Sequence, residues 1–231
     1  MVNTGVVYMT TSNPIIAAHL KRTGGFQDVN PVILTSGEIG IYYVNTEKLM
    51  EDGGEFNDYG NDAGAMYKHA IGMLDRNKNF REIIDIIARD AEQLLPHNGA
   101  AISGGQRRDW LFSAAVAKTL GVPHISLYKQ EEGKPDRIEV HANGGTRQDV
   151  SIKDFQVIHV ADLITEGSSF HEKDGDKTYG WIPMLRNAGA KVGHALIVTT
   201  RLQGGEDKLR ALDIEPRTFV SIDEAFLKEH S

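Results

Sequence analysis

The chain has 231 residues, of which 25 are basic and 32 acidic, so that its formal net charge is −7. Its 40% of hydrophobic and 25% of charged residues fit a globular protein and exclude collagen-like or wholly disordered chains. An acidic balance without a long run of Lys and Arg argues against a nucleic-acid partner. The lack of cysteine excludes disulfides, thiolate nucleophiles and cysteine-based metal sites, and a cytoplasmic location is the natural expectation.

Neither a membrane span nor a secretion signal is predicted. No stretch approaches the roughly 20 apolar residues that a membrane-spanning helix needs. The first residues lack the basic start and the long apolar run of a signal peptide. We therefore expect no membrane partner.

Length and patterning predict a single domain over residues 1–231. About residues 1–95 look helical and irregular, and about residues 96–231 alternate β-branched runs with helical patterns. Near the end of the first portion, a helix is predicted to begin at Asn79, where Asn79 and Glu82 would form a capping box, and to end before Pro96. The apolar face of this helix consists of Ile83, Ile84, Ile87, Ala91 and Leu94.

The second portion shows the pattern of an α/β fold. Short apolar runs predict strands, and two of the segments between them predict helices that end at a glycine. The strands are expected at 99–103, 124–128, 157–160, 194–199 and 218–221, and the helices at 109–120 and 181–187. This alternation predicts a right-handed parallel sheet flanked by helices. Ligands of such sheets bind at the carboxyl ends of the strands, where we therefore look for chemistry.

Two segments rich in Gly and Asp, 53–64 and 171–180, are predicted to be surface loops. Asp174 and Asp176 are spaced as in some calcium loops, but the rest of that pattern is missing, so a solvated loop is favoured over a calcium site.

The most informative segment is a buried strand that runs into a loop of small and hydroxyl-bearing residues. The loop consists of Thr165, Glu166, Gly167, Ser168 and Ser169. Consecutive backbone N–H groups and hydroxyls can bind a phosphate, and a glycine lets the backbone approach it closely. Asp162, at the end of the strand, could accept hydrogen bonds from sugar hydroxyls. The same residues would also suit a Ser/Thr-rich turn at a helix start, so both interpretations remain open.

This segment resembles the phosphoribosyl diphosphate (PRPP) signature of type I phosphoribosyltransferases, in which two acids and two apolar residues precede a T-x-G-x-S/T loop. The chain has Ala161 and Asp162 where the family has two adjacent acids. Thr165 stands where purine-specific members carry Asp and orotate enzymes carry Thr or Ser, so the resemblance favours the orotate branch and adds Thr165 to the base site.

Three further stretches resemble orotate phosphoribosyltransferase, so the match runs from about residue 30 onward. The stretch 34–45 is similar to the hood over the base and implies that Tyr43 and Val44 lie beside it, with Thr35 in place of the family's lysine. The stretch 197–205 resembles the strand whose arginine binds the base, a role that falls to Arg201. The stretch 102–109 resembles the pyrophosphate loop, whose implied ligands are Gly104, Gly105, Arg107 and Arg108.

The resemblance also implies a mobile catalytic loop. Lys129 opens this loop, and His141 precedes the Asn-Gly-Gly that closes it. Tyr128 replaces the loop arginine and Glu139 replaces the expected lysine, for which Lys134 or Arg137 could stand in.

The function implied by the resemblance is transfer of the phosphoribosyl group of PRPP to orotate with release of pyrophosphate, in pyrimidine nucleotide synthesis. The implied catalytic residues are Lys129, His141 and Asp162. Mg²⁺ would be bound mainly through PRPP, without a dedicated metal site, and the enzyme would be a homodimer. Two alternatives stay open: a regulatory protein that binds PRPP or a nucleotide, and a phosphoribosyltransferase for another base. A dinucleotide-dependent oxidoreductase is disfavoured, because the loop after the first predicted strand lacks the G-x-G-x-x-G spacing.

Overall fold

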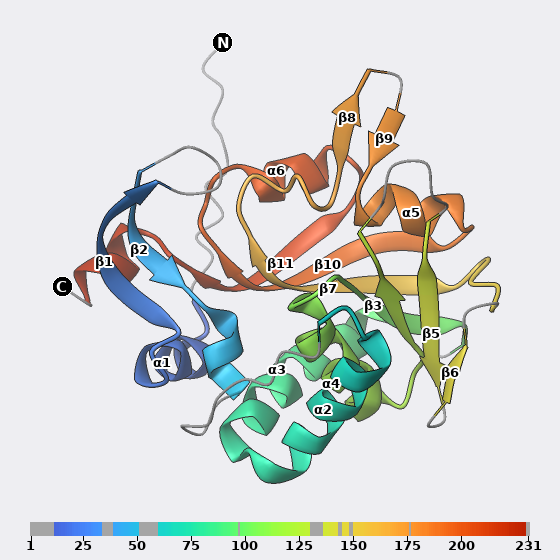
Figure 1. Ribbon diagram of the computed structural model, residues 1–231, viewed down its shortest axis with the longest axis horizontal. Helices are drawn as coiled ribbons and strands as arrows, with labels where there is room; N and C mark the ends of the chain where they lie inside the picture. The colour runs from blue at the N-terminus through green and yellow to red at the C-terminus, as the bar shows by residue number, and fades with distance from the viewer. Residues whose placement is uncertain are drawn as a thin grey trace.

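The computed structural model describes residues 12–33, 39–50, 60–96, 98–129, 136–142, 145–147, 150–175 and 177–229. A seven-stranded sheet forms its centre (Figure 1). In the order of pairing, the strands are β11 (Glu215–Ser221), β10 (Lys191–Thr200), β7 (Gln156–Ile164), β3 (Ala100–Gly105), β4 (His124–Leu127), β5 (Ile138–Ala142) and β6 (Gly145–Arg147).

The first five strands of this order are parallel, which confirms the predicted parallel sheet and its five apolar runs. Strands β5 and β6 pair antiparallel to their neighbours, and the sequence had not indicated them. They are short, and β6 is exposed throughout, so neither shows the continuous apolar run that marks a strand buried on both faces.

Helices cover both faces of the sheet, as predicted for an α/β fold. One face packs against α2 (Ala63–Arg76), α3 (Lys78–Leu94) and α4 (Asp109–Leu120). The other face packs against α5 (Trp181–Asn187) and α6 (Gly205–Arg210) (Figure 1). Successive side chains of β7 point to opposite faces: Ile158 and Val160 enter the first core, and Val157 and Ala161 the second.

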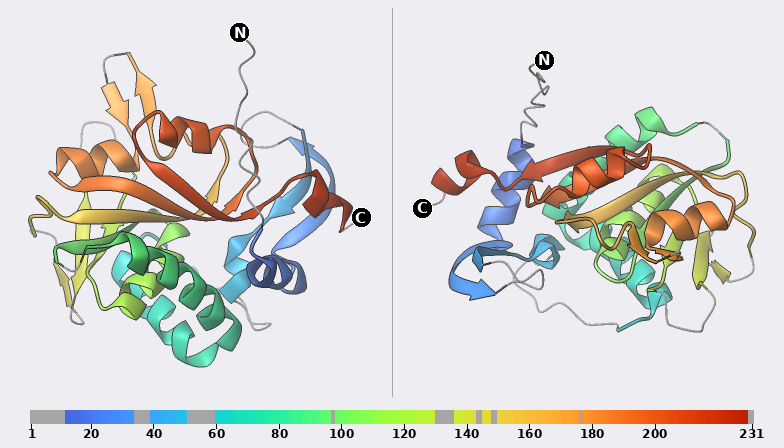
Figure 2. Two further views of the ribbon diagram at one scale, coloured as in Figure 1. Left: turned by 180° about the vertical axis from the view of Figure 1, so that it is seen from behind. Right: turned by 90° about the horizontal axis from the view of Figure 1, so that it is seen from above.

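The N-terminal residues form a small hood, which consists of α1 (Pro14–Arg22), the antiparallel pair β1 (Phe26–Ile33) and β2 (Ile39–Val44), and the 3-10 helix η1 (Thr46–Met50). The hood lies at one end of the molecule and β5–β6 at the other (Figures 1 and 2). The ring of Phe26 in the hood contacts the ring of Phe226 in α7 (Glu224–Lys228) edge to face, with the ring centroids 5.0 Å apart, so the hood packs against α7. The expectation of a merely helical and irregular N-terminal portion missed this hairpin.

The long amphipathic helix exists, but it begins earlier than predicted. Its cap is Asn77, whose Oδ1 accepts hydrogen bonds from the backbone N–H groups of Asn79 and Phe80 at 2.9 and 3.0 Å. The predicted capping box of Asn79 and Glu82 is therefore wrong, because the nearby Asn77 already satisfies the first N–H groups of the helix. The helix ends at Leu94, close to the predicted stop.

The segment 171–180, predicted as a loop, contains an exposed hairpin of β8 (Glu172–Asp174) and β9 (Lys177–Tyr179). Asp176 lies outside the described residues. In the part of the chain that the structure describes, no helix is long and apolar enough to cross a bilayer.

Candidate active site

The loops at the carboxyl ends of β3 and β4 meet the hood around one cleft. The cleft has a volume of about 630 Å³. Its lining residues are Tyr43, Glu47, Asn61, Gln106, Arg107, Arg108 and Lys129. The structure thus brings together four residues that the sequence indicated in three separate segments, namely Tyr43, Arg107, Arg108 and Lys129. Three of the four are cations, so the cleft suits an anionic ligand.

The two glycines of the loop after β3 are required by packing. A side chain at Gly104 would overlap Ser113 of α4, and one at Gly105 would overlap the indole of Trp181. The Gly105 N–H donates a 3.2 Å hydrogen bond to Asp109 Oδ2. The expectation that this N–H faces a ligand is therefore wrong, because it already donates its hydrogen bond to Asp109.

Asp162 lies two residues before the end of β7 and is 6% exposed. Its Oδ2 accepts a 2.6 Å hydrogen bond from Thr46 Oγ1 and lies 3.3 Å from Arg108 Nε. The carboxylate of Asp162 is the main cause that raises the pKa of Arg108 above its ordinary value. The structure therefore joins Asp162, Arg108 and the hood in one contact network.

Asp109, the first residue of α4, is a site residue that the sequence analysis missed. Its Oδ1 accepts a 2.9 Å hydrogen bond from the backbone N–H of Asp162. Burial, and next the charge of Asp162, raise the pKa of Asp109 well above its ordinary value. The available signal was weak, because an acid in the first turn of a helix usually faces solvent and the helix dipole.

Backbone hydrogen bonds, both within the loop and to Gly205, hold the loop after β7 in shape. Gly167 has φ of 74°, and its carbonyl oxygen accepts hydrogen bonds from the N–H groups of Phe170 and His171 at 3.1 and 3.2 Å. The carbonyl oxygen of Thr165 accepts one from Gly205 N at 2.9 Å. This geometry places Gly167 in the interior, whereas Glu166, Ser168 and Ser169 are exposed.

The two serines of this loop line a second, smaller cleft of about 290 Å³. Its other lining residues are Lys129, Glu172, Tyr179, Gly180 and Trp181. Lys129 lines both clefts, so the phosphate loop and the cationic cleft are neighbours. The hairpin β8–β9 contributes Glu172 and Tyr179, which the sequence analysis did not connect with the site.

Of the residues expected at the base, Tyr43 and Val44 have opposite surroundings. Tyr43 is 45% exposed and lines the large cleft, whereas Val44 is 1% exposed and belongs to the apolar core. The predicted contact of Val44 with a base is wrong, because neighbouring residues of a strand point to opposite sides. Thr35 lies outside the described residues.

Arg201 follows β10, and its guanidinium carbon lies 5.5 Å from the centroid of the Tyr42 ring. Its backbone N–H donates a 3.1 Å hydrogen bond to the carbonyl oxygen of Ile164. The Nε atom is buried without a hydrogen-bond partner in the described part of the chain. A buried guanidinium N–H that lacks a partner is a candidate for binding a ligand oxygen.

Lys129 and His141, the residues expected on one mobile loop, also differ in their surroundings. Lys129 is exposed, and its backbone N–H donates a 2.7 Å hydrogen bond to Gln106 Oε1. His141 lies in β5, is 1% exposed and uses both ring nitrogens, toward Thr146 Oγ1 at 2.9 Å and Ser126 Oγ at 3.0 Å. The expected place of His141 on a catalytic loop is therefore wrong, and burial lowers the pKa of its ring.

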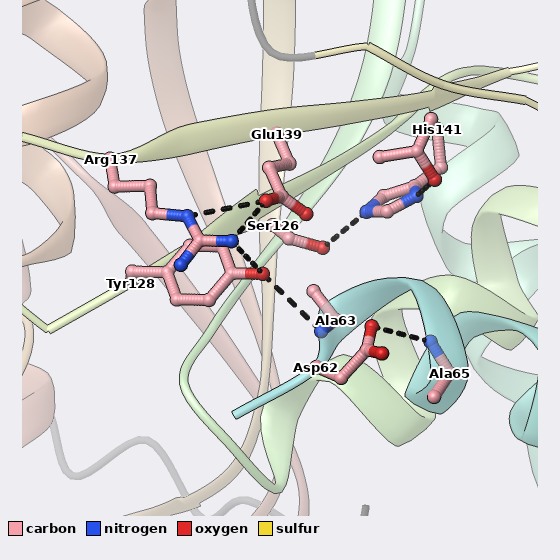
Figure 3. A network of polar contacts seen from close by, with 9 residues as sticks. Asp62, Ala63, Ala65, Ser126, Tyr128, Arg137, Glu139 and His141 are labelled. Carbon is pink, nitrogen blue, oxygen red and sulfur yellow. Dashed lines mark hydrogen bonds and ion pairs between the residues drawn. The ribbon is translucent and has the colours of Figure 1, made fainter. Parts of the chain in front are cut away.

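A polar network joins Tyr128, which follows β4, to Arg137, which precedes β5 (Figure 3). The segment 130–135 between them lies outside the described residues. The Arg137 guanidinium lies 3.9 Å from the centroid of the Tyr128 ring, and its Nε is 3.2 Å from Glu139 Oε1. The Tyr128 hydroxyl accepts a 3.3 Å hydrogen bond from Ala63 N. Arg137 is thus committed to this network rather than to the cleft, and Lys134 is outside the described residues.

Comparisons with known proteins agree with this geometry, although no protein-family model matches the chain. An adenine phosphoribosyltransferase of Mannheimia succiniciproducens is 24% identical over 174 residues, which are 69% of this chain and 87% of the relative. An orotate phosphoribosyltransferase of Halobacterium salinarum is 32% identical over 111 residues, or 47% of this chain and 54% of the relative.

Among solved structures, orotate phosphoribosyltransferase from Aeropyrum pernix aligns with a TM-score of 0.66 and 18% identity, over 93% of this chain and 97% of that one. This similarity shows the shared fold. The sequence relatives, this fold and the loop signature after β7 lead to one conclusion: the chain is similar to adenine and orotate phosphoribosyltransferases and has the fold of these enzymes.

Proposed function

We propose that the chain transfers the phosphoribosyl group of PRPP to an orotate-like base and releases pyrophosphate. The observation that carries this proposal is the large cleft, which is lined by Tyr43, Arg107, Lys129 and Arg108, and the Nε of Arg108 lies 3.3 Å from Asp162 Oδ2. PRPP needs cations for its diphosphate and a carboxylate for its ribose hydroxyls, and the cleft offers both side by side.

The work of the protein in this reaction is mainly electrostatic. The bond from ribose C1 to the diphosphate breaks while the base nitrogen bonds to C1, and the ribose carries positive charge in the transition state. Arg107 and Lys129 stabilise the negative charge that develops on the departing oxygens. Arg108 contributes there through its position beside Asp162, which in turn accepts hydrogen bonds from the ribose hydroxyls.

The loop after β7 binds the 5′-phosphate in this proposal. Ser168 and Ser169 line the small cleft and can offer hydroxyl groups, and Lys129, which also lines it, supplies a positive charge. Gly167 keeps the backbone in the tight turn that directs these groups.

Mg²⁺ is proposed to enter with PRPP. No group of three His, Asp or Glu side chains that could hold a metal occurs within the described residues. The donor set that does fit is the oxygens of PRPP itself, with Asp162 as a neighbouring carboxylate. When bound, the ion would neutralise charge on the diphosphate.

Arg201 favours a base that carries a carboxylate. Its buried Nε lacks a partner among the residues described, and a guanidinium binds a planar carboxylate through two parallel hydrogen bonds. Thr165, where purine-specific relatives carry Asp, points in the same direction. Adenine is the second candidate, because adenine phosphoribosyltransferases are among the sequence relatives.

The test measures pyrophosphate release from PRPP and Mg²⁺ with orotate, uracil, adenine, hypoxanthine and guanine in turn. Release with orotate is the expected result, and Lys129→Ala should reduce its rate strongly. Release with adenine alone would redirect the proposal to a purine. Binding of PRPP without turnover with any base would identify a regulatory protein in place of an enzyme.

We also propose a homodimer located in the cytoplasm, on the family resemblance alone. Light scattering after gel filtration measures the assembled mass, and a monomer over the whole concentration range would contradict the first part. Fractionation of the native host tests the second.

A further inference from the structure

Among the described residues that line the large cleft, Glu47 is the one acid. It belongs to η1 of the hood and lines the same cleft as three cations, Arg107, Arg108 and Lys129. In a site for a bare diphosphate, a carboxylate among these cations would repel the ligand and lower its affinity. Its position is favourable when the ligand also carries groups that donate hydrogen bonds to a carboxylate.

The short element that carries Glu47 is anchored on both sides of this residue. Thr46, Leu49 and Met50 are 0–1% exposed and belong to the buried part of η1. The backbone N–H of Glu47 donates a 3.0 Å hydrogen bond to Asn45 Oδ1. The backbone of Glu47 is therefore held in place beside the cleft, and its half-buried side chain lines it.

Glu47 also lies next in the chain to the contact between the hood and β7. The hydroxyl of Thr46 donates a 2.6 Å hydrogen bond to Asp162 Oδ2, and the same oxygen is 3.3 Å from Arg108 Nε. The pKa of Arg108 is raised first by the charge of Asp162 and, among the other charges, next by that of Glu47. Two carboxylates from different elements thus act on one guanidinium.

The chemistry of PRPP requires such a combination of groups. Its ribose carries two neighbouring hydroxyls close to the carbon that bears the diphosphate. Asp162 Oδ2 already accepts the Thr46 hydroxyl and faces Arg108, which leaves less of its capacity for the sugar. Ala161 is buried in the apolar core on the α5 side of the sheet, so the neighbouring position of β7 supplies no polar group. A second acceptor has to come from another element.

We propose that Glu47 is a specificity-determining residue whose carboxylate binds the ribose hydroxyls of PRPP beside Asp162. The acid from the hood accepts hydrogen bonds from the sugar, while Arg107 and Lys129 bind the diphosphate. The cleft thereby favours a phosphorylated pentose over a bare diphosphate. This inference rests on the proposed function, because it takes PRPP as the ligand.

A merely structural role for Glu47 makes the opposite prediction for the diphosphate. An acid that only held Arg108 in place would strengthen diphosphate binding, and its removal would weaken that binding. An acid that binds hydroxyls lowers the affinity for the diphosphate through its charge. Its removal would strengthen the binding of the diphosphate and weaken the binding of the sugar.

The experiment measures the two halves of PRPP separately by calorimetry. Ribose 5-phosphate has the hydroxyls without the diphosphate, and pyrophosphate has the charge without the hydroxyls. A chelator removes Mg²⁺, so that no ion links the carboxylate to the phosphate oxygens. The proteins are the wild type, Glu47→Gln, Glu47→Asp and the control Glu224→Gln, which alters an exposed acid of α7 paired with Lys228 at 3.3 Å. Circular dichroism verifies that each variant is folded, and Glu47→Asp decides the question alone if Glu47→Gln does not fold.

Glu47→Gln should bind ribose 5-phosphate about three- to tenfold more weakly, because a neutral amide oxygen is a weaker acceptor than a carboxylate. It should bind pyrophosphate about two- to fivefold more tightly at low salt, because one negative charge is gone from the cleft. Glu47→Asp keeps the charge but shortens the side chain, so only the affinity for ribose 5-phosphate should fall. Glu224→Gln should match the wild type with both ligands.

Unchanged or tighter binding of ribose 5-phosphate by the Glu47 variants, or weaker binding of pyrophosphate by Glu47→Gln, would overturn the inference. Failure of the proposed function has a different signature: Glu47→Gln shows the two opposite changes, but the wild type releases no pyrophosphate from PRPP with any base. If the wild type bound neither ligand, the inference and the proposed function would both be wrong.

Discussion

Thr46 and Asp162 are joined by a 2.6 Å hydrogen bond, although they lie 116 positions apart in the chain. Thr46 is fully buried and begins η1, immediately after the hood hairpin. The hydroxyl donates to Oδ2, the same oxygen that lies 3.3 Å from Arg108. The position of the hood and the orientation of the Asp162 carboxylate are therefore coupled.

The substitution Thr46→Val tests this coupling. It keeps the shape of the side chain and removes the donor, so Asp162 is expected to bind PRPP about ten- to hundredfold more weakly, in line with a hydrogen bond to a charged group. Calorimetry with PRPP and Mg²⁺ measures the change. Thr119→Val removes a hydroxyl that donates to Ala115 O at 3.0 Å on α4 and should leave the affinity unaltered. Equal affinities of the two variants would disprove the coupling.

Asp162→Asn is expected to weaken PRPP binding by about one to two orders of magnitude, because the ribose contact and the charge beside Arg108 are lost together. The same calorimetric titration measures this, with Asp207→Asn as the control for net charge. An unchanged affinity would remove Asp162 from the ribose site.

Arg201→Ala should raise the KM for the base more than the KM for PRPP. Arg201 follows β10, and its guanidinium lies near the ring of Tyr42. Its buried Nε can donate a hydrogen bond to the base. Initial rates with one substrate varied at a time give both constants. The matched control is Arg217→Ala on the neighbouring strand, whose guanidinium pairs with Asp90 at 3.0 Å. A larger effect on PRPP than on the base would place Arg201 elsewhere in the site.

Gly105→Ala should reduce the free energy of unfolding by about 1–3 kcal/mol, as expected for overpacking. The added methyl group would overlap the Trp181 indole, which is itself buried. Gly193→Ala on β10 is the control, since a methyl group there meets nothing within 4 Å. Urea denaturation of both variants measures the difference. Similar free energies of unfolding for the two variants would contradict this prediction and show that the loop can move away from Trp181 at little cost in stability.

His159→Asn should make stability less sensitive to acid. The folded-state pKa of His159 is about 3 and the ordinary value is about 6.5, so the unfolded chain takes up a proton that the folded chain refuses. This part of the stability is complete above about pH 7 and is lost as the pH falls; between pH 7 and pH 5 it amounts to about 2 kcal/mol.

Urea denaturation at pH 7 and pH 5 measures this slope in both proteins. Asp109, whose pKa is raised, contributes with the opposite sign, but it is present in both and largely cancels in the comparison. Asn can keep the hydrogen bond that Ser103 makes with Nδ1 at 3.0 Å. Parallel pH dependences of the wild type and His159→Asn would contradict the prediction.

The parallel part of the sheet was predictable because its strands are buried on both faces and read as apolar runs. Edge strands such as β6 are exposed and short, and their pairing depends on partners that a local pattern does not contain. The start of α3 was misplaced for a similar reason: two asparagines two positions apart both suit a cap, and packing selects Asn77, whose Nδ2 also donates to Met50 O at 2.8 Å.

At the site, the sequence indicated the cations and the phosphate loop because these are contiguous motifs. It could not show that Val44 faces inward, since the register of the hood hairpin decides this. It also placed His141 on a loop, because the pairing of β5 with β4 is a tertiary contact. Asp109 was missed for the same reason, although it stands within a recognised motif, because its partner Asp162 is 53 positions away in the chain.

The chain has two tryptophans, and both contact the glycines at the end of β3. Trp110 Nε1 donates a 3.1 Å hydrogen bond to Gly104 O, and the ring of Trp181 covers Gly105. Any rearrangement of this loop therefore alters the environment of every indole in the molecule. Intrinsic fluorescence is therefore a natural reporter of the conformation of the loop after β3, without an attached dye.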